Sequence, residues 1–326
     1  MKTRILQTLK EHKGYVSGQE LCDALGISRT AVWKYINKLK EEGYQIEAVP
    51  NKGYHLLTVP DVLTESEIKS RIFTKWAGKE IHCYNSVDST NNAAKTAAEQ
   101  GSPHGALFLA EQQSSGKGRR GRGWVSLPGT GIWMTILLRP QLEPSYASML
   151  TLVAALSMSK AIKAQTGLEA QIKWPNDVVI NGKKVCGILT EMSAEMEQIH
   201  YVVIGLGTNV NIEEFPKEIQ DRATSLKIES KKEIERVPVI CAFLSYFEED
   251  YENFMEHRNL SGLLEQYNKR LVNCGRAVRV LDPKGEYSGT AKGVDSTGAL
   301  IVEKEKGETV AITSGEVSVR GIYGYV

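Results

Sequence analysis

Ten consecutive residues in the first half of the chain, Ser114 to Gly123, combine four glycines with four cationic side chains. Glycine lets backbone N–H groups come close to an oxyanion because it has no Cβ in the way. Several fixed cations can also neutralise two negatively charged reactants that are brought together. The loop therefore predicts a binding site for anions, with a solvated basic linker as the alternative.

Gly116, Gly118 and Gly121 in this loop spell G-x-G-x-x-G, which is also the spacing of dinucleotide-binding loops. Such a loop must be followed by a helix, and the Pro- and Gly-containing run at 127–131 excludes a helix here. A nucleoside-triphosphate loop of the Walker type is excluded as well, because Lys117 is followed by glycine instead of Ser or Thr.

A second chemistry-bearing run is KWPND at residues 173–177, which leads into two apolar stretches separated by Asn181-Gly182. An Asn-Gly pair between apolar stretches is a strong hairpin signal. Lysines and a carboxylate, including Asp177 and Lys184, bracket this hairpin and could lie together over a bound phosphate and its metal. An exposed hairpin whose charges only keep its edge soluble is the alternative.

Two shorter segments complete the set. Asp88-Ser89-Thr90-Asn91 is typical of a helix start, and simple N-capping is its plainer interpretation. The glycines of the run at 205–209 permit close backbone approach to a ligand, although a turn at a strand end explains them equally well. The six histidines have no metal-ligand spacing and no nucleophile elbow is present, so triad hydrolase chemistry has no support.

The N-terminal residues carry the pattern of a winged helix-turn-helix. Apolar residues recur at helical spacing in three short segments, of which the third contains Val32, Ile36 and Leu39. Gly26 suits the sharp turn before that helix, and Ser28 is placed to cap it. Alternating apolar residues on both sides of a turn at 50–53 then predict a hairpin, the wing.

Composition and charge set the general class of the protein. The chain has 326 residues, 41 % hydrophobic and 24 % charged, which is typical of a globular protein of two or three domains. Residues 1–57 have a net charge of +3 and the remainder −2. No export signal or membrane span is visible. Five cysteines without C-x-x-C spacing support neither disulfides nor zinc, so we expect reduced thiols in a cytosolic (cytoplasmic) protein.

The chain as a whole reads as an α+β multidomain protein. Residues 58–67 suit a linker, because they contain Pro60 and lack apolar periodicity. We expect a winged helix-turn-helix domain at 1–60 and a mixed α/β domain at 64–271. Short strands separated by turns after Gly275 predict a small β-barrel at 275–326.

The four motifs at 116–121, 173–177, 184–189 and 205–209 together resemble the signatures of biotin protein ligases, and they follow in the same order. With a winged helix in front and a small barrel behind, the resemblance covers essentially the whole chain. It points to the bifunctional bacterial type, which is both a ligase and a repressor of the biotin operon. The implied architecture is a central biotin/lipoate ligase domain, class II synthetase-like, and an SH3-like β-barrel at the C-terminus.

The resemblance implies a two-step reaction with ATP and Mg²⁺ as co-substrates and no structural metal. Biotin's carboxylate attacks the α-phosphate of ATP, and a lysine of biotin carboxyl carrier protein then attacks the biotinyl-AMP. Because carboxylate and triphosphate repel each other, the basic loop would screen both.

The resemblance also implies a role for individual residues. Arg119 and Lys184 should be catalytic. Biotin should contact Ser89, Thr90, Asn91, Gln113, Gly116, Lys117, Gly118, Arg119 and Lys184. ATP or the adenylate should contact Arg119, Arg120, Trp124, Lys173, Asn176 and Asn209, with Asp177 as an Mg²⁺ contact. The family often has arginine where this chain has Lys117, and lysine lacks the planar fork for a carboxylate, so a backbone role suits Lys117 better.

In the N-terminal unit the polar face of the third helix and the wing should contact DNA. The residues expected there are Ser28, Arg29, Thr30, Lys34, Lys38 and Lys52. One winged helix has a small footprint, so we expect a homodimer, formed with the adenylate bound, on a two-fold operator of biotin biosynthesis genes. A helical bundle with ordinary surface lysines is the alternative to DNA binding. A lipoate or octanoyl ligase and a biotin-sensing repressor without ligase activity are the alternative functions, and no membrane partner is expected.

Overall fold

The computed structural model describes residues 1–326 except 197, 283–284, 306, 314–317, 322–324 and 326. The chain separates into two compact units. One unit comprises residues 1–73 together with Glu235–Cys241, and the other comprises Thr74–Ile234 together with 242–326. The expected domains at 64–271 and 275–326 therefore fall mostly within one compact unit. The boundaries at 60, 64, 271 and 275 remain our proposal for the domains.

The first unit is the expected winged helix-turn-helix. Its elements are α1 (Lys2–Glu11), α2 (Gly18–Leu25), α3 (Arg29–Glu41), β1 (Gln45–Val49) and β2 (Gly53–Thr58). Gly26 ends α2 with φ 66°, and the Ser28 hydroxyl accepts a hydrogen bond from Ala31 N at 3.2 Å. The apolar faces of the three helices and Ile46 of β1 share one core. The predicted helices, cap and wing are confirmed.

The segment expected as a linker is more ordered than its composition suggests. Residues Glu65–Lys69 form a short helix, α4, capped by Thr64, and Ile68 is fully buried. Glu67 of this helix is also buried, because it accepts hydrogen bonds from Tyr44 Oη at 2.6 Å and Lys10 Nζ at 2.5 Å. Residues 59–64 carry no helix or strand, as expected of a linker, and the order within 65–67 comes from the Thr64 cap and the hydrogen bonds of Glu67.

The second unit is built on a seven-stranded sheet in the order β3-β4-β5-β9-β8-β7-β6. The strands are β3 (Ile81–Val87), β4 (Leu107–Gln113), β5 (Gly131–Leu138), β6 (Gln171–Lys173), β7 (Asp177–Ile180), β8 (Lys183–Ala194) and β9 (Ile199–Asn209). Only β3 and β4 among the pairs in this sheet run parallel. All eight residues of β5 are buried, as a central strand covered on both faces requires.

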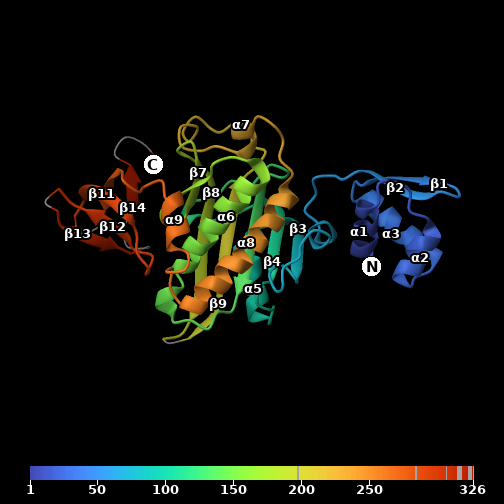
Figure 1. The fold of residues 1–326 in the computed structure, drawn as a ribbon, viewed down its shortest axis with the longest axis horizontal. Coiled ribbons are helices and arrows are strands. Elements are labelled where there is room, and N and C mark those ends of the chain that lie inside the picture. The colour runs from blue at the N-terminus through green and yellow to red at the C-terminus, as the bar shows by residue number, and fades with distance from the viewer. Residues whose placement is uncertain (197, 283–284, 306, 314–317, 322–324, 326) are drawn as a thin grey trace. The chain divides into compact units, whose positions relative to one another are not determined.

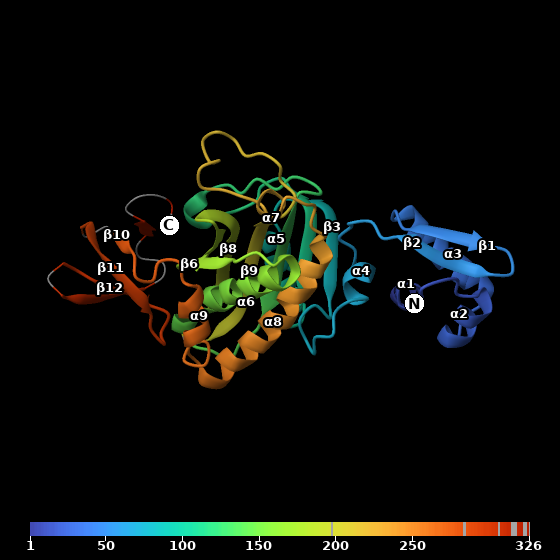
Figure 2. The ribbon, with the colours of Figure 1, turned by 45° about the horizontal axis from the view of Figure 1, so that its top comes forward.

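Helices cover both faces of this sheet (Figures 1 and 2). Consecutive strand residues point to opposite faces. Thr190 of β8 bonds Thr151 of α6 (Met149–Thr166) at 2.7 Å, whereas Glu191 bonds Lys95 of α5 (Thr90–Glu99) at 2.9 Å. The two helices therefore lie on opposite faces. Figure 1 shows α8 (Arg236–His257) beside α6, and α7 (Leu226–Ser230) and α9 (Leu264–Arg270) complete the helices of the described residues.

The apolar helix α6 explains one feature of the sequence. Residues Pro144–Thr166 are long and apolar enough to cross a membrane, but 78 % of an apolar 18-residue stretch within them is buried inside the protein. This segment is accordingly a core helix packed on the sheet.

The C-terminal strands form a five-stranded antiparallel sheet in the order β13-β12-β11-β10-β14. They are β10 (Ala277–Leu281), β11 (Tyr287–Val294), β12 (Leu300–Glu303), β13 (Thr309–Ile312) and β14 (Ser318–Gly321). Trp174, from the 173–177 run, is buried and donates through Nε1 to Gly298 O at 3.1 Å. This tryptophan therefore joins the ligase-like sheet to the C-terminal strands.

Candidate functional site

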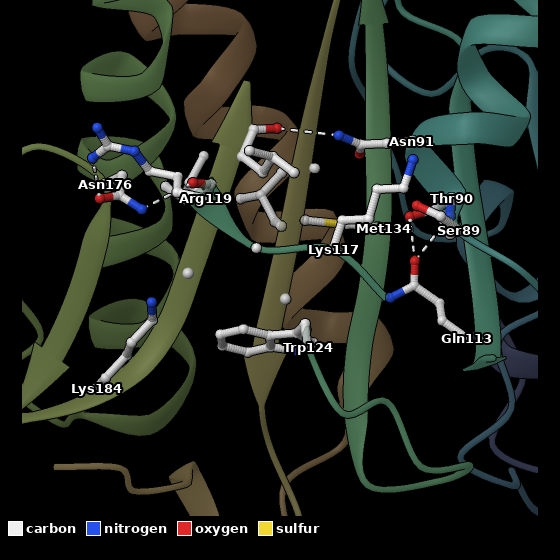
Figure 3. Close-up of a pocket in the computed structure, with 17 residues that line it drawn as sticks. Ser89, Thr90, Asn91, Gln113, Lys117, Arg119, Trp124, Met134, Asn176 and Lys184 are labelled. Atoms are coloured by element: carbon white, nitrogen blue, oxygen red, sulfur yellow. Dashed lines mark hydrogen bonds between the residues drawn. The ribbon is translucent and has the colours of Figure 1, made fainter. Parts of the chain in front are cut away.

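A pocket opens over the centre of the seven-stranded sheet, where β4, β5, β8 and β9 meet the N-terminus of α5 and the glycine-rich loop (Figure 3). Its lining brings together segments that are far apart in the sequence. The lining residues are Ser89, Thr90, Asn91, Gln113, Lys117, Gly118, Arg119, Trp124, Met134, Asn176, Lys184, Gly187, Ile188, Leu189, Gly205, Leu206 and Gly207.

One side of the pocket is lined by hydroxyl and amide groups. Gln113 Oε1 accepts from Thr90 N at 2.8 Å and lies 3.1 Å from Thr90 Oγ1, while its Nε2 donates to Ser126 Oγ at 2.8 Å. Asn91 Nδ2 donates to Glu191 Oε2 at 2.8 Å. Fixed donors and acceptors of this kind suit a neutral polar ring.

The opposite side carries cations, as Figure 3 shows for Arg119 and Lys184. Arg119 Nη1 donates to Asn176 Oδ1 at 2.9 Å, and Asn176 is itself held by Ile188 O at 3.1 Å. Burial lowers the pKa of the Arg119 guanidinium, and Asp177 partly offsets that effect; arginine nevertheless stays charged in proteins. Lys184 Nζ lies 2.5 Å from Asp177 Oδ1. This side suits an anion.

Trp124 lies between the two sides, on strands that leave room for it because they carry glycine. A Cβ on Gly207 would come within 2.6 Å of the Trp124 ring, and one on Gly187 within 2.9 Å. Lys184 Nζ lies 5.2 Å from the ring centroid. The sequence indicated Gly207 only as permissive of ligand approach, whereas in the structure Gly207 and Gly187 also make room for an aromatic side chain.

Five of the expected ligand contacts lie outside the pocket lining: Gly116, Arg120, Lys173, Asp177 and Asn209. The carbonyl of Gly116 accepts a hydrogen bond from Trp124 N at 2.8 Å, which joins the two ends of the glycine-rich loop. Arg120 is exposed and has φ 57°. Lys173 Nζ stacks 3.3 Å from the ring centroid of Tyr325, and Asn209 Nδ2 donates to Thr224 O at 3.1 Å.

Two side chains at the start of α5 behave differently from the simple capping interpretation. Ser89 precedes the helix but makes no side-chain cap hydrogen bond, and it is buried against the pocket. The Asp88 carboxylate instead accepts a hydrogen bond from Asn92 Nδ2. The other end of that amide, Asn92 Oδ1, accepts from Lys117 Nζ at 2.7 Å. Asn92 therefore anchors the lysine of the glycine-rich loop to the helix. The aliphatic contribution of Met134 to the pocket had no local signal in the sequence.

The described residues offer little for a resident metal ion. Among them there is no group of three or more His, Cys, Asp or Glu side chains that could hold one. Asp177 is the expected Mg²⁺ contact, and its carboxylate is already bound by Lys184 and by the Tyr325 hydroxyl. An Mg²⁺ ion carried in on phosphates needs only one or two carboxylates, so the donor set fits an ion that arrives with its nucleotide.

In the first unit, all six residues expected to contact DNA are exposed: Ser28, Arg29, Thr30, Lys34, Lys38 and Lys52. Gln19 of α2 orients Arg29 through a 2.9 Å hydrogen bond. Trp33 lies on the same helix one turn after Arg29, and its side chain is 58 % exposed. An aromatic residue in an amphipathic helix ordinarily indicates core, so the sequence carries no signal that Trp33 lies on the surface.

Comparisons with known proteins match three separate segments of the chain. Residues 84–209 match the biotin/lipoate A/B protein ligase family, residues 2–55 match a helix-turn-helix domain, and residues 274–320 match the biotin protein ligase C-terminal domain. The bifunctional ligase/repressor BirA of Bacillus spizizenii is 42 % identical over 90 % of each chain. Its Escherichia coli counterpart is 27 % identical over 93 % of this chain and 92 % of that protein.

A solved structure is similar in fold as well. The biotin protein ligase of Aquifex aeolicus, in complex with biotin and ATP, superposes with a TM-score of 0.65 at 32 % identity. The match covers 74 % of this chain and 99 % of the Aquifex chain.

Proposed function

This chain belongs to the family of bifunctional biotin ligases and repressors, and from that premise we propose that it activates biotin with ATP and transfers it to a protein lysine. The observation that carries the proposal is the division of the pocket. A hydroxyl- and amide-lined side faces a side where Arg119 and Lys184 converge from different segments. A small molecule with a polar ring at one end and a carboxylate at the other matches that arrangement.

In the first step we assign Arg119 and Lys184 to the developing negative charge. Biotin's carboxylate oxygen attacks the α-phosphorus of ATP, the bond to the β-phosphate oxygen breaks, and pyrophosphate leaves with the electron pair. Both reactants are anions, so two fixed cations reduce their repulsion and stabilise the charge that builds up between them. Asn176 keeps the Arg119 guanidinium in place.

The remaining contacts follow from position in the pocket. We assign Ser89, Thr90, Asn91 and Gln113, together with the backbone at Lys117 and Gly118, to the biotin ring. Trp124 would pack on the adenine. Mg²⁺ bound to ATP would supply further charge neutralisation, with Asp177 as its contact from the chain. Gly116, Arg120, Lys173 and Asn209 would support the loop and the strands from outside the lining.

In the second step a lysine of biotin carboxyl carrier protein attacks the mixed anhydride and AMP leaves. A purified acceptor domain should become labelled on one lysine when biotin, ATP and Mg²⁺ are present. Streptavidin detection after electrophoresis, with the acceptor's lysine replaced by arginine as the control, measures this transfer. Labelling with lipoate in preference to biotin would refute the proposal.

We also propose that the N-terminal unit represses a biotin operon as a homodimer with biotinyl-AMP as corepressor. The basic loop has four glycines and four mutually repelling cations, so an anionic ligand should order it. If ordering favours self-association, the dimer favours a two-fold operator by linkage. Sedimentation with and without biotin plus ATP tests the first link. The five cysteines form no disulfide, which suits action in the cytosol.

A further inference from the structure

A chain of buried and half-buried polar groups runs beside the pocket and ends on a half-buried carboxylate outside its lining. Its links are the following contacts: Lys95 Nζ to Glu191 Oε1 at 2.9 Å, Asn91 Nδ2 to Glu191 Oε2 at 2.8 Å, Thr135 Oγ1 to Asn91 Oδ1 at 2.6 Å, and Thr135 Oγ1 to Thr90 Oγ1 at 2.8 Å. Gln113 continues it at Thr90. The chain joins β8, α5, β5 and β4.

Glu191 fixes the orientation of the Asn91 amide. A carboxylate and the carbonyl of Leu189, 3.3 Å away, can only accept hydrogen bonds, so both must face Asn91 Nδ2. The amide oxygen then faces Thr135. A Cβ on Gly205 would lie 2.2 Å from that oxygen, so glycine at this position is what makes room for it.

The orientation of Asn91 also fixes two protons. A threonine hydroxyl has one proton, and that of Thr135 goes to Asn91 Oδ1. That leaves the single proton of Thr90 for two contacts, 2.8 Å to Thr135 Oγ1 and 3.1 Å to Gln113 Oε1, and we assign it to the shorter one. Gln113 Oε1 then accepts only from Thr90 N, and its second lone pair is left for a ligand in the pocket.

We propose that Glu191 is a positioning residue for the ring of biotin. It acts through Asn91, Thr135 and Thr90 to keep Gln113 Oε1 available as an acceptor for a ring N–H. The inference rests on the proposed function, because it takes biotin as the ligand and assigns Gln113 to its ring. The lowered pKa of Glu191, where bonds from Asn91 and Lys95 outweigh the desolvation that raises it, keeps this carboxylate ionised at neutral pH.

Replacing Glu191 with glutamine should reverse the direction of the hydrogen bonds between residue 191 and Gln113. Lys95 can only donate, so it should hold the oxygen of the introduced amide and turn its nitrogen toward Asn91. We expect Asn91 to rotate so that it accepts at the shorter, 2.8 Å contact and gives up its 3.3 Å bond to Leu189 O. Its nitrogen then faces Thr135, and the protons of Thr135 and Thr90 move toward Gln113. Both lone pairs of Gln113 Oε1 are then filled from within the protein.

Pyrophosphate exchange by the full-length protein, measured at varied biotin and at varied ATP concentrations, tests the proposed role of Glu191. In Glu191→Gln we expect the KM for biotin to rise about ten- to a hundredfold, the loss of one ligand hydrogen bond, with the KM for ATP and kcat within about twofold. Glu195→Gln is the matched control, because Glu195 lies on the same hairpin with an 80 % exposed side chain. It should behave as wild type.

An analogue with CH₂ in place of a ring N–H gives a second readout. If that N–H meets Gln113, the analogue should bind wild type much more weakly than biotin does, and Glu191→Gln should discriminate less between the two. A fixed discrimination ratio would overturn the inference.

Thr135→Val and Thr135→Ser keep the test valid if Glu191→Gln unfolds. The valine variant removes the buried link at similar volume and should raise the biotin KM, whereas serine retains the hydroxyl and should not. The inference about Glu191 would be overturned, and the proposed function left standing, by either of two results. One is an equal change in the KM for biotin and the KM for ATP, and the other is an unaltered KM for biotin in a folded Glu191→Gln or Thr135→Val variant. Absence of exchange in wild type would overturn the proposed function and this inference with it.

Discussion

Arg119 and Arg122 lie three residues apart in one loop, yet the structure gives them different surroundings. Arg119 is partly buried, lines the pocket and is held by Asn176, whereas Arg122 is exposed. We expect Arg119→Ala to reduce adenylate formation roughly ten- to a hundredfold, because one charge-assisted contact is worth about 1.5 to 3 kcal/mol. Arg122→Ala should cost little. Equal losses in single-turnover adenylation would show that the loop acts only as a diffuse positive field.

Among the strands, β8 and β9 make room for the Trp124 ring because they carry glycine at positions 187 and 207. In Gly207→Ala the new Cβ would come within 2.6 Å of the indole, so the ring should be displaced while the strand persists. We expect the Kd for ATP to rise severalfold and the Kd for biotin to change less. Gly14→Ala is the control, since a Cβ there has no neighbour within 4 Å. Isothermal titration with each ligand measures both, and unaltered nucleotide affinity would exclude a role for Trp124.

The same comparison shows what the sequence could predict. Local signals were sufficient where neighbours in sequence decide the structure: Ser28 caps α3, and Asn181 and Gly182 turn the hairpin with φ 50° and 76°. The pocket depends on register between distant strands, which pairs Thr135 with Gly205 and Trp133 with Gly207. The spacing of residues along one strand does not indicate which residues of a distant strand lie opposite them. Met134 and Glu191 therefore had no signal, and Lys173 and Asn209 were placed in the site although both lie outside its lining.

At the scale of the whole molecule, the DNA-binding and ligase activities should be separable by mutation. Arg29 and Lys34 are exposed on α3 in the first unit, and the pocket residues all belong to the second. We expect Arg29→Ala with Lys34→Ala to weaken operator binding and, if both touch phosphates, to reduce the slope of log K against log salt by about two. Ligation should be unaffected. Fluorescence anisotropy at several salt concentrations measures this, and unchanged operator affinity would contradict DNA contact by α3.

The most direct test of the proposed biotin ligase activity is biotin-dependent exchange of labelled pyrophosphate into ATP by the purified protein. It examines the choice of ligand and the adenylation step together, without an acceptor protein or DNA. We expect exchange that requires biotin and Mg²⁺, is not supported by lipoate, and falls strongly in Arg119→Ala. Exchange supported by lipoate and not by biotin, or no exchange by folded wild-type protein at saturating biotin, would contradict it.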